Sequence, residues 1–249
     1  MDRSLSPLGA RERLIFALDV ADLEEARGLA SSLAGAVGML KVGLELYCAH
    51  GPEVASLARS NGLELFLDLK LHDIPETVAR AVERVAGLGA RYLTVHASGG
   101  RAMLREAERR AQAARSSGAL LELVAVTVLT SLDGDDLASL GVDRVPAEHA
   151  VALAELAWGE GVRAFVCSAA EVALLRSKLG PEATLLTPGI RPAGATVGDQ
   201  KRVSTPESAI RAGADRLVVG RPIRDALDRA AAARAIVASI EDALEGGRR

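Results

Sequence analysis

Short runs of apolar and β-branched residues alternate along the chain with longer stretches in which apolar residues recur every three or four positions. The first kind is typical of buried strands, and the second of amphipathic helices. The strand-like runs are eight in number and lie at 14–20, 38–44, 63–70, 91–96, 121–129, 163–168, 184–190 and 215–220. The helical stretches that follow them cover 22–34, 52–61, 76–88, 100–115, 148–159, 169–179, 205–213 and 224–245. The pattern therefore predicts a strand–helix unit repeated eight times.

The order of these elements favours a (β/α)8 TIM barrel, an α/β fold, in a single domain. Alternating strands and helices imply parallel strands with right-handed crossovers, and the runs are apolar enough to be buried on both faces. A doubly wound open sheet is the alternative, but it would more often carry a glycine-rich turn after the first strand, and ALDVADLEEA has none. No linker rich in Pro, Gly or Ser interrupts the chain, so we expect an N-terminal tail over 1–12 and the barrel over 13–249.

Two long stretches show neither pattern, 130–146 and 189–204, and both follow predicted strands. In a barrel, the segments that follow strands surround the mouth of the active site. We therefore expect both stretches there, with 189–204 acting as a lid.

Composition excludes several classes of partner. The formal net charge is −3 with both signs interspersed, which indicates neither nucleic-acid binding nor membrane binding and leaves a small molecule as the expected ligand. The N-terminus has no apolar signal segment, and no stretch of eighteen apolar residues follows, so we expect a cytoplasmic protein. Cys48 and Cys167 lack the spacing of a zinc site and are expected to be reduced and buried.

Charged residues gather at the carboxyl ends of the predicted strands, the face where barrel enzymes keep their chemistry. Asp19 ends the first strand, Lys41 lies on the second, and Asp68 and Lys70 end the third. Asp68 and Lys70 are two positions apart, so we expect them on one face of the strand, where a charge is costly unless paired. A salt bridge between strands is one explanation. The nearby carboxylate of Asp73 favours the other, a network that keeps a lysine protonated as an acid.

Two further motifs predict a phosphate site. VVGRPI places Gly220 and Arg221 between the last strand and a helix, whose N-terminus offers free backbone N–H groups. TPGIRP, with Pro188 and Arg191, follows the neighbouring strand, and barrels often bind phosphate at these two strands. The planar guanidinium of Arg221 also suits phosphate oxygens.

Together these motifs identify a resemblance to one enzyme family. The segments FALDV, LKVGLELY, FLDLKLHDIPETV, VHASGG, TVLTS, LLTPGIRP and GDQKRVSTPESAIRAGADRLVVGRPI are similar to those of the compact bacterial orotidine 5′-phosphate decarboxylases. The likeness runs from about residue 13 to about residue 240, and D-x-K-x-x-D-I-P-x-T is its specific part. It implies a homodimeric barrel that converts orotidine 5′-monophosphate to uridine 5′-monophosphate and CO2, the last step of pyrimidine nucleotide biosynthesis, without a cofactor or metal.

The resemblance also implies roles for the charged residues. Lys70 resembles the acid that protonates C6 of the pyrimidine, and Asp68 the carboxylate beside the carboxylate of the substrate. Lys41 resembles the lysine that holds Asp68 and the ribose hydroxyls, and Asp19 the aspartate that binds ribose.

The remaining substrate contacts implied by the resemblance fall into three groups. The first group crosses the dimer interface and contacts the substrate in the partner subunit's site. The second group binds the pyrimidine edge, and the third surrounds the phosphate. The members are Asp73, Ile74 and Thr77 for the first group, Thr130 and Ser131 for the second, and Pro188, Arg191, Gln200, Gly220 and Arg221 for the third.

Two other functions remain open at this stage. A related barrel lyase could act on a sugar phosphate with Mg²⁺, and Glu45 lies near the place where such a site needs a metal-binding glutamate. A non-catalytic phosphate-binding barrel is the second, although it predicts a damaged charge network. His72 and His96 are expected to be hydrogen-bonded neighbours of the site rather than its acids or bases.

Overall fold

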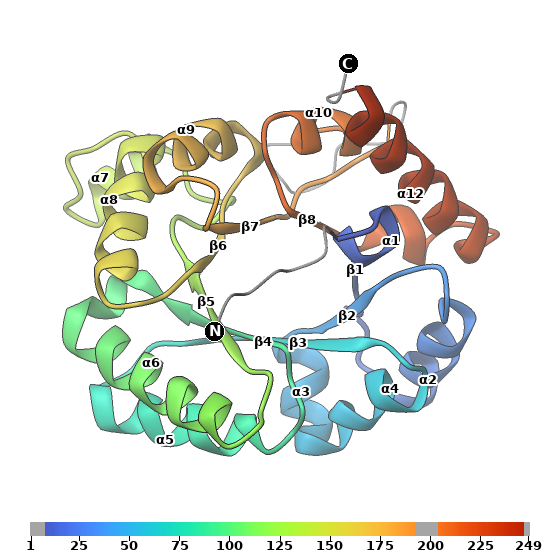
Figure 1. Ribbon diagram of the computed structural model, residues 1–249, viewed down its shortest axis with the longest axis horizontal. Coiled ribbons are helices and arrows are strands. Elements are labelled where there is room, and N and C mark those ends of the chain that lie inside the picture. The colour runs from blue at the N-terminus through green and yellow to red at the C-terminus, as the bar shows by residue number, and fades with distance from the viewer. Residues whose placement is uncertain (1–7, 193–203, 247–249) are drawn as a thin grey trace.

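The computed structural model describes residues 8–192 and 204–246. In this part of the chain, eight parallel strands follow one another in chain order around a closed barrel (Figure 1). They are β1 (Leu14–Ala17), β2 (Met39–Val42), β3 (Glu64–Leu71), β4 (Tyr92–His96), β5 (Glu122–Val126), β6 (Ala164–Val166), β7 (Thr184–Thr187) and β8 (Arg216–Val219). Because β1 also pairs with β8, the sheet has no edge, and the predicted TIM barrel is confirmed over the open sheet.

Helices surround the barrel on the outside (Figure 1). Those that match the predicted stretches are α2 (Leu23–Ser32), α4 (Ala55–Ser60, preceded by the 3₁₀ turn Gly51–Val54), α5 (Pro75–Ala86), α6 (Gly100–Ser116, preceded by the 3₁₀ turn Ala97–Gly99), α8 (Pro146–Gly159), α9 (Ala169–Leu179), α10 (Pro206–Arg211) and α12 (Arg229–Gly246). Four short helices were not predicted, namely α1 (Ala10–Arg13), α3 (Leu44–His50), α7 (Gly134–Ser139) and α11 (Arg221–Arg224).

The stretch 130–146 is therefore not irregular throughout, as the sequence had suggested. α7 begins at a capping box in which Asp133 and Asp136 each accept a hydrogen bond from the backbone N–H of the other. Local capping rather than a helical period marks the start of this helix. Most of the predicted lid, 193–203, lies outside the described residues.

The core has two layers. Apolar side chains of the strands that point outward pack against the helices, as α5 shows with Val78, Val82 and Val85 buried on one face. Inward-pointing side chains fill the barrel itself: Ile15, Ala17, Met39, Phe66, Tyr92, Val124, Ala164, Leu186 and Val218. The barrel is thus a packed core, so a ligand can bind only above its inner layer.

The two cysteines differ in exposure. Cys167 is buried after β6, and burial raises the pKa of its thiol well above the ordinary value. Cys48 is exposed on α3, so the expectation that both are buried was wrong for this residue. In the described part of the chain, every helix is too short or too polar to span a bilayer.

Candidate active site

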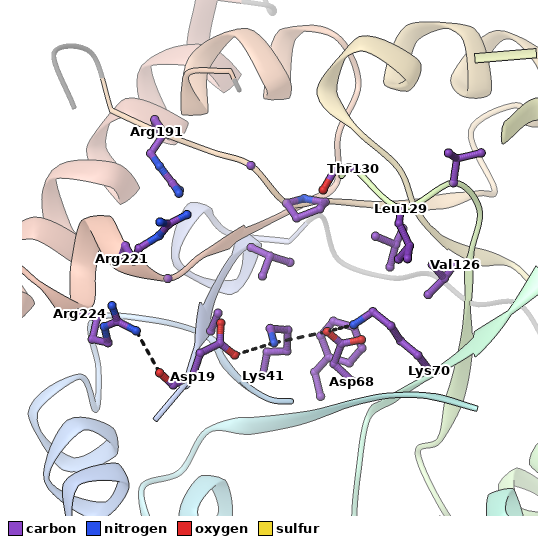
Figure 2. A pocket seen from close by; sticks show the side chains of 18 residues that line it. Asp19, Lys41, Asp68, Lys70, Val126, Leu129, Thr130, Arg191, Arg221 and Arg224 are labelled. Atoms are coloured by element: carbon purple, nitrogen blue, oxygen red, sulfur yellow. Dashed lines mark hydrogen bonds and ion pairs between the residues drawn. The ribbon is translucent and has the colours of Figure 1, made fainter. Parts of the chain in front are cut away.

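A cavity of about 460 Å³ opens at the carboxyl ends of the strands. Its floor is apolar, because the upper side chains of the barrel interior line it, among them Ala17, Phe66 and Val218. Charged side chains stand around this floor, with Lys70 on one side and three arginines on the other (Figure 2). An apolar base with charged groups at both ends suits a flat ring that carries anionic groups.

Strand alternation explains how three of the charged residues enter the cavity. Asp19, Lys41 and Asp68 each come two positions after an inward-pointing residue of β1, β2 or β3. Because side chains alternate between the two faces of a strand, these three must also point inward. They lie above the packed interior, where the barrel opens into the cavity.

The inward charges form a continuous network. Lys41 Nζ lies 3.0 Å from Asp19 Oδ1 and 3.4 Å from Asp68 Oδ2. Lys70 Nζ donates to the same oxygen of Asp68 at 2.8 Å. The predicted proximity of these four residues is confirmed, and the order of charges along the network is minus, plus, minus, plus.

The backbone of β3 is irregular at this point. Leu67 pairs with Leu93 and Leu71 with Val95, so β3 uses four residues where β4 uses two. Lys70 has a φ of 47°, in the left-handed region that residues with a side chain rarely adopt. The prediction that Asp68 and Lys70 meet was therefore right, but simple alternation along a regular strand was the wrong reason for Lys70.

The network shifts the pKa values of its buried members. Burial disfavours the ammonium of Lys41, but the carboxylates of Asp68 and Asp19 outweigh it and raise its pKa. Burial likewise opposes the charge of Asp68, yet Lys41, Lys70 and a hydrogen bond from Thr94 hold its pKa below the ordinary value. Both groups are therefore charged at neutral pH.

Three guanidinium groups line the other end of the cavity. Arg191 is almost fully buried and donates to the carbonyl of Ile190, and Arg221 is the first residue of α11. Arg224, the last residue of α11, donates to the carbonyl of Asp19 at 3.0 Å and so connects the ends of β8 and β1 (Figure 2). The side opposite Lys70 is therefore the cationic end expected for a phosphate.

Most of the predicted site residues line this one cavity. They are Asp19, Lys41, Asp68, Lys70, Thr130, Pro188, Arg191, Gly220 and Arg221. Four others do not line it: Asp73, Ile74, Thr77 and Ser131, all of which are exposed. Gln200 lies outside the described residues.

The histidines lie beside the network. The rings of His72 and His96 are 5.4 Å apart, and neither lines the cavity. Burial lowers the pKa of His96, and the adjacent His72 and Lys70 lower it further. At neutral pH His96 is therefore uncharged.

Sequence reasoning missed Arg224 and Thr94. Arg224 lies one helical turn after Arg221, so the spacing could have indicated it. Thr94 comes two positions after the inward-pointing Tyr92, and strand alternation could have indicated it too. Nothing in the sequence, however, marks its hydroxyl as a partner of Asp68 at 3.0 Å.

The family model described as "Orotidine 5'-phosphate decarboxylase / HUMPS family" matches residues 12–236, which include every strand of the barrel. The chain belongs to this family. Among curated members, it is 52% identical over 230 residues to an orotidine 5'-phosphate decarboxylase of Thermobifida fusca, covering 92% of this chain and 95% of the relative. It is 50% identical over 229 residues to the enzyme of that name from an Anaeromyxobacter species, covering 92% and 98%.

Two solved structures share the architecture. The crystal structure of orotidine 5'-phosphate decarboxylase from Lactobacillus acidophilus has a TM-score of 0.81 at 36% identity, covering 91% of this chain and 98% of that one. An uncharacterized conserved protein from Geobacillus kaustophilus has a TM-score of 0.80 at 33% identity, covering 91% and 99%. The structural similarity to both proteins therefore extends over 91% of this chain.

Proposed function

We propose that the protein decarboxylates orotidine 5′-monophosphate to uridine 5′-monophosphate and CO2 in pyrimidine nucleotide biosynthesis, with no cofactor. The observation that carries this proposal is the alternating network of Asp19, Lys41, Asp68 and Lys70 at one end of a cavity whose other end is lined by arginines. Membership of the family and about 50% identity to relatives named for this activity support it.

Lys70 is the proposed proton donor. When the bond between C6 and the carboxylate carbon breaks, its electron pair remains on C6 in an orbital that the ring π-system delocalises poorly. A nearby ammonium stabilises this charge and then transfers a proton to C6, leaving Lys70 as a neutral amine and releasing CO2. Asp68 holds the ammonium at 2.8 Å, which restricts it to one place before the reaction begins.

Asp68 and Lys41 have supporting roles in this mechanism. Because its pKa is held low, Asp68 is ionised. In this proposal the carboxylate of the substrate binds beside it. The resulting repulsion is relieved as CO2 leaves, but stabilisation of the carbanion by Lys70 is the main contribution in this proposal. Lys41 keeps Asp68 charged and, with Asp19, is placed to bind the ribose hydroxyls.

The cationic end of the cavity supplies binding energy through the phosphate, at a distance from the reacting carbon. Arg191 and Arg221 offer several N–H donors to a phosphate, and contacts to such a remote group can position the ring over Lys70. Thr130 lines the same cavity and is assigned to the pyrimidine edge, together with Ser131 from the adjoining exposed segment.

The proposed assembly is a homodimer with shared sites. Asp73, Ile74 and Thr77 are exposed and do not line their own cavity, and Ile74 exposes 67% of its surface although it is a large apolar residue. An exposed isoleucine in the loop before α5 is well suited to contact a second copy of the chain. In this arrangement Asp73 of each chain completes the charge network of the other.

A sugar-phosphate lyase that uses Mg²⁺ is less well supported. Glu45, the residue that would bind the metal, is exposed on α3 and does not line the cavity.

The free, exposed thiol of Cys48 supports a reducing compartment, and we assign the protein to the cytoplasm.

The decisive experiment follows the absorbance change of orotidine 5′-monophosphate in the presence of EDTA. We expect full activity with chelator, and loss of activity in Lys70→Ala with the fold retained. Lys178→Ala is the matched control, because Lys178 is exposed on α9, away from the cavity. Near-normal turnover by Lys70→Ala, or dependence on added Mg²⁺, would contradict the proposal.

A further inference from the structure

The left-handed backbone of Lys70 requires something to hold it. Within residues 8–192 and 204–246, Lys70 is the only residue other than glycine with a positive φ. Such a conformation persists only where the surrounding structure fixes it, and it tends to occur at functional sites. The shift in register between β3 and β4 falls at the same place, so the regular ladder between the two strands does not provide this support.

The hydroxyl of Thr94 occupies the gap in the ladder. Thr94 lies on β4, is fully buried, and points into the barrel above Tyr92. Its Oγ1 accepts a hydrogen bond from the backbone N–H of Lys70 at 2.7 Å and donates one to Asp68 Oδ1 at 3.0 Å. A hydroxyl has one donor, so this donor is fully used by the carboxylate. One oxygen atom thus fixes both the backbone of Lys70 and the rotation of Asp68.

The two oxygens of Asp68 are divided between different partners. Oδ1 accepts from Thr94, while Oδ2 faces both lysines. If Oδ1 lost its partner, the carboxylate could rotate and offer either oxygen to Lys70. Thr94 itself does not line the cavity, so any effect on a bound molecule must pass through Asp68 and Lys70.

We propose that Thr94 is a positioning residue for the decarboxylation, holding Lys70 in its left-handed conformation and Asp68 in a single orientation so that the ammonium stays aimed into the cavity. This inference rests on the proposed function of Lys70 as the proton donor. Thr94 thereby joins the residues proposed to support the reaction, and its role depends on its hydroxyl and not on its volume.

Electrostatics supports the same role. The hydrogen bond from Thr94 is one of the interactions that hold the pKa of Asp68 below its ordinary value against the effect of burial. Removal of the hydroxyl should therefore raise the pKa of Asp68. A residue that only filled space would not change this pKa.

The test compares two substitutions at this position. Thr94→Val keeps the shape and removes the hydroxyl, whereas Thr94→Ser keeps the hydroxyl and removes a methyl group. We expect the valine variant to lose roughly 10- to 100-fold in kcat, as for a lost hydrogen bond to a charged group, with KM changed by less than about threefold. Its acid limb in the pH profile of kcat should move to higher pH. The serine variant should lie within a few-fold of the wild type in each measurement.

Thr127→Val is the matched control. Thr127 is also a buried threonine, directly after β5, and its hydroxyl donates to the carbonyl of Val166 at 3.0 Å; Thr127 does not line the cavity. This variant should lose a similar amount of thermal stability but keep its kcat and its acid limb. Thr94→Ala provides a second variant without the hydroxyl if the valine variant does not fold.

The outcomes separate this proposal from the proposed function. Wild-type kcat and an unmoved acid limb in the hydroxyl-free variant would overturn the role of Thr94, as would a serine variant as impaired as the valine variant. If Lys70→Ala is inactive at the same time, the role of Lys70 stands and only that of Thr94 fails. If Lys70→Ala is active, the proposed function of Lys70 is wrong, and the role of Thr94, which rests on it, is wrong as well.

Discussion

Lys41 Nζ lies 3.4 Å from Asp68 Oδ2, on the neighbouring strand, and this is the oxygen that also accepts from Lys70. The two lysines are not equivalent. Lys41 is nearly fully buried and also contacts Asp19, whereas about a third of the side chain of Lys70 is exposed at the cavity. One lysine therefore maintains the charge of Asp68, and the other is free to react.

Substitution of Lys41 should affect both the charge and the stability of the site. In Lys41→Met, burial of Asp68 is less well compensated, so its pKa rises and the acid limb of kcat/KM moves to higher pH. The free energy of unfolding at pH 7 should fall by roughly 3 kcal/mol, the low end for a broken buried pair because Lys70 remains. Urea denaturation and a pH–rate profile measure the two effects. Equal stability of Lys41→Met and the surface control Lys178→Met would show that the pair contributes nothing.

His96 should make stability depend on pH. Its pKa is lowered in the folded protein by burial and by His72 and Lys70, so the unfolded chain binds more protons between the folded pKa and about 6.5. The contribution is therefore present above about pH 6.5 and is lost as the pH falls toward the folded pKa. In His96→Asn, which cannot titrate, the free energy of unfolding should fall less steeply from pH 7.5 to pH 5. Parallel curves for the two proteins would exclude His96.

The fold was predictable because its signals are repeated and local. Each of the eight strands is an apolar run, and each predicted helix has apolar residues at helical spacing. A wrong prediction for one element therefore does not affect the predictions for the others. α3 was missed because its first residue, Leu44, is separated from the end of β2 by a single residue and was included in the predicted strand 38–44. Its seven residues are too few for the helical period to correct that impression.

The site was predictable where it follows strand alternation and unpredictable where it does not. Asp19, Lys41 and Asp68 obey the alternation. The left-handed φ of Lys70 falls at the mismatch between β3 and β4, which is a property of two paired strands and leaves no trace in either sequence alone. The exposure of Asp73 likewise depends on a turn of the backbone after β3 that residue types do not specify.

Substitution of an arginine at the cationic end of the cavity should impair only the reaction of a substrate that carries a phosphate. Arg221→Ala should lower kcat/KM for orotidine 5′-monophosphate by about 10- to 100-fold, in line with a lost charged contact, and should hardly change the slow reaction of orotidine, which has no phosphate. Arg234→Ala, an exposed arginine on α12, is the control. Equal losses with both substrates would remove Arg221 from the phosphate site.

The shared site makes a quantitative prediction about mixed dimers. If Asp73 acts in the partner subunit's cavity, Asp73→Asn and Lys70→Ala homodimers should both be nearly inactive, because every site in each carries a lesion. A heterodimer of the two has one site with both lesions and one site with neither. Random exchange of equal amounts makes about half of the dimers heterodimers, so about one site in four is intact. Activity should therefore recover toward a quarter of the wild-type value, as measured by the absorbance assay after exchange.

The first control for this experiment verifies that the two variants exchange subunits. Native mass spectrometry of subunits with different masses measures the fraction of heterodimers. A mixture of Lys70→Ala with Lys41→Met should stay at the mean activity of its two parents, since both residues line the cavity of their own chain and no intact site forms. With exchange verified, activity that stays at the level of the parents would mean that Asp73 acts within its own chain. The exposed position of Asp73, beside an isoleucine with 67% of its surface exposed, makes recovery the expected result.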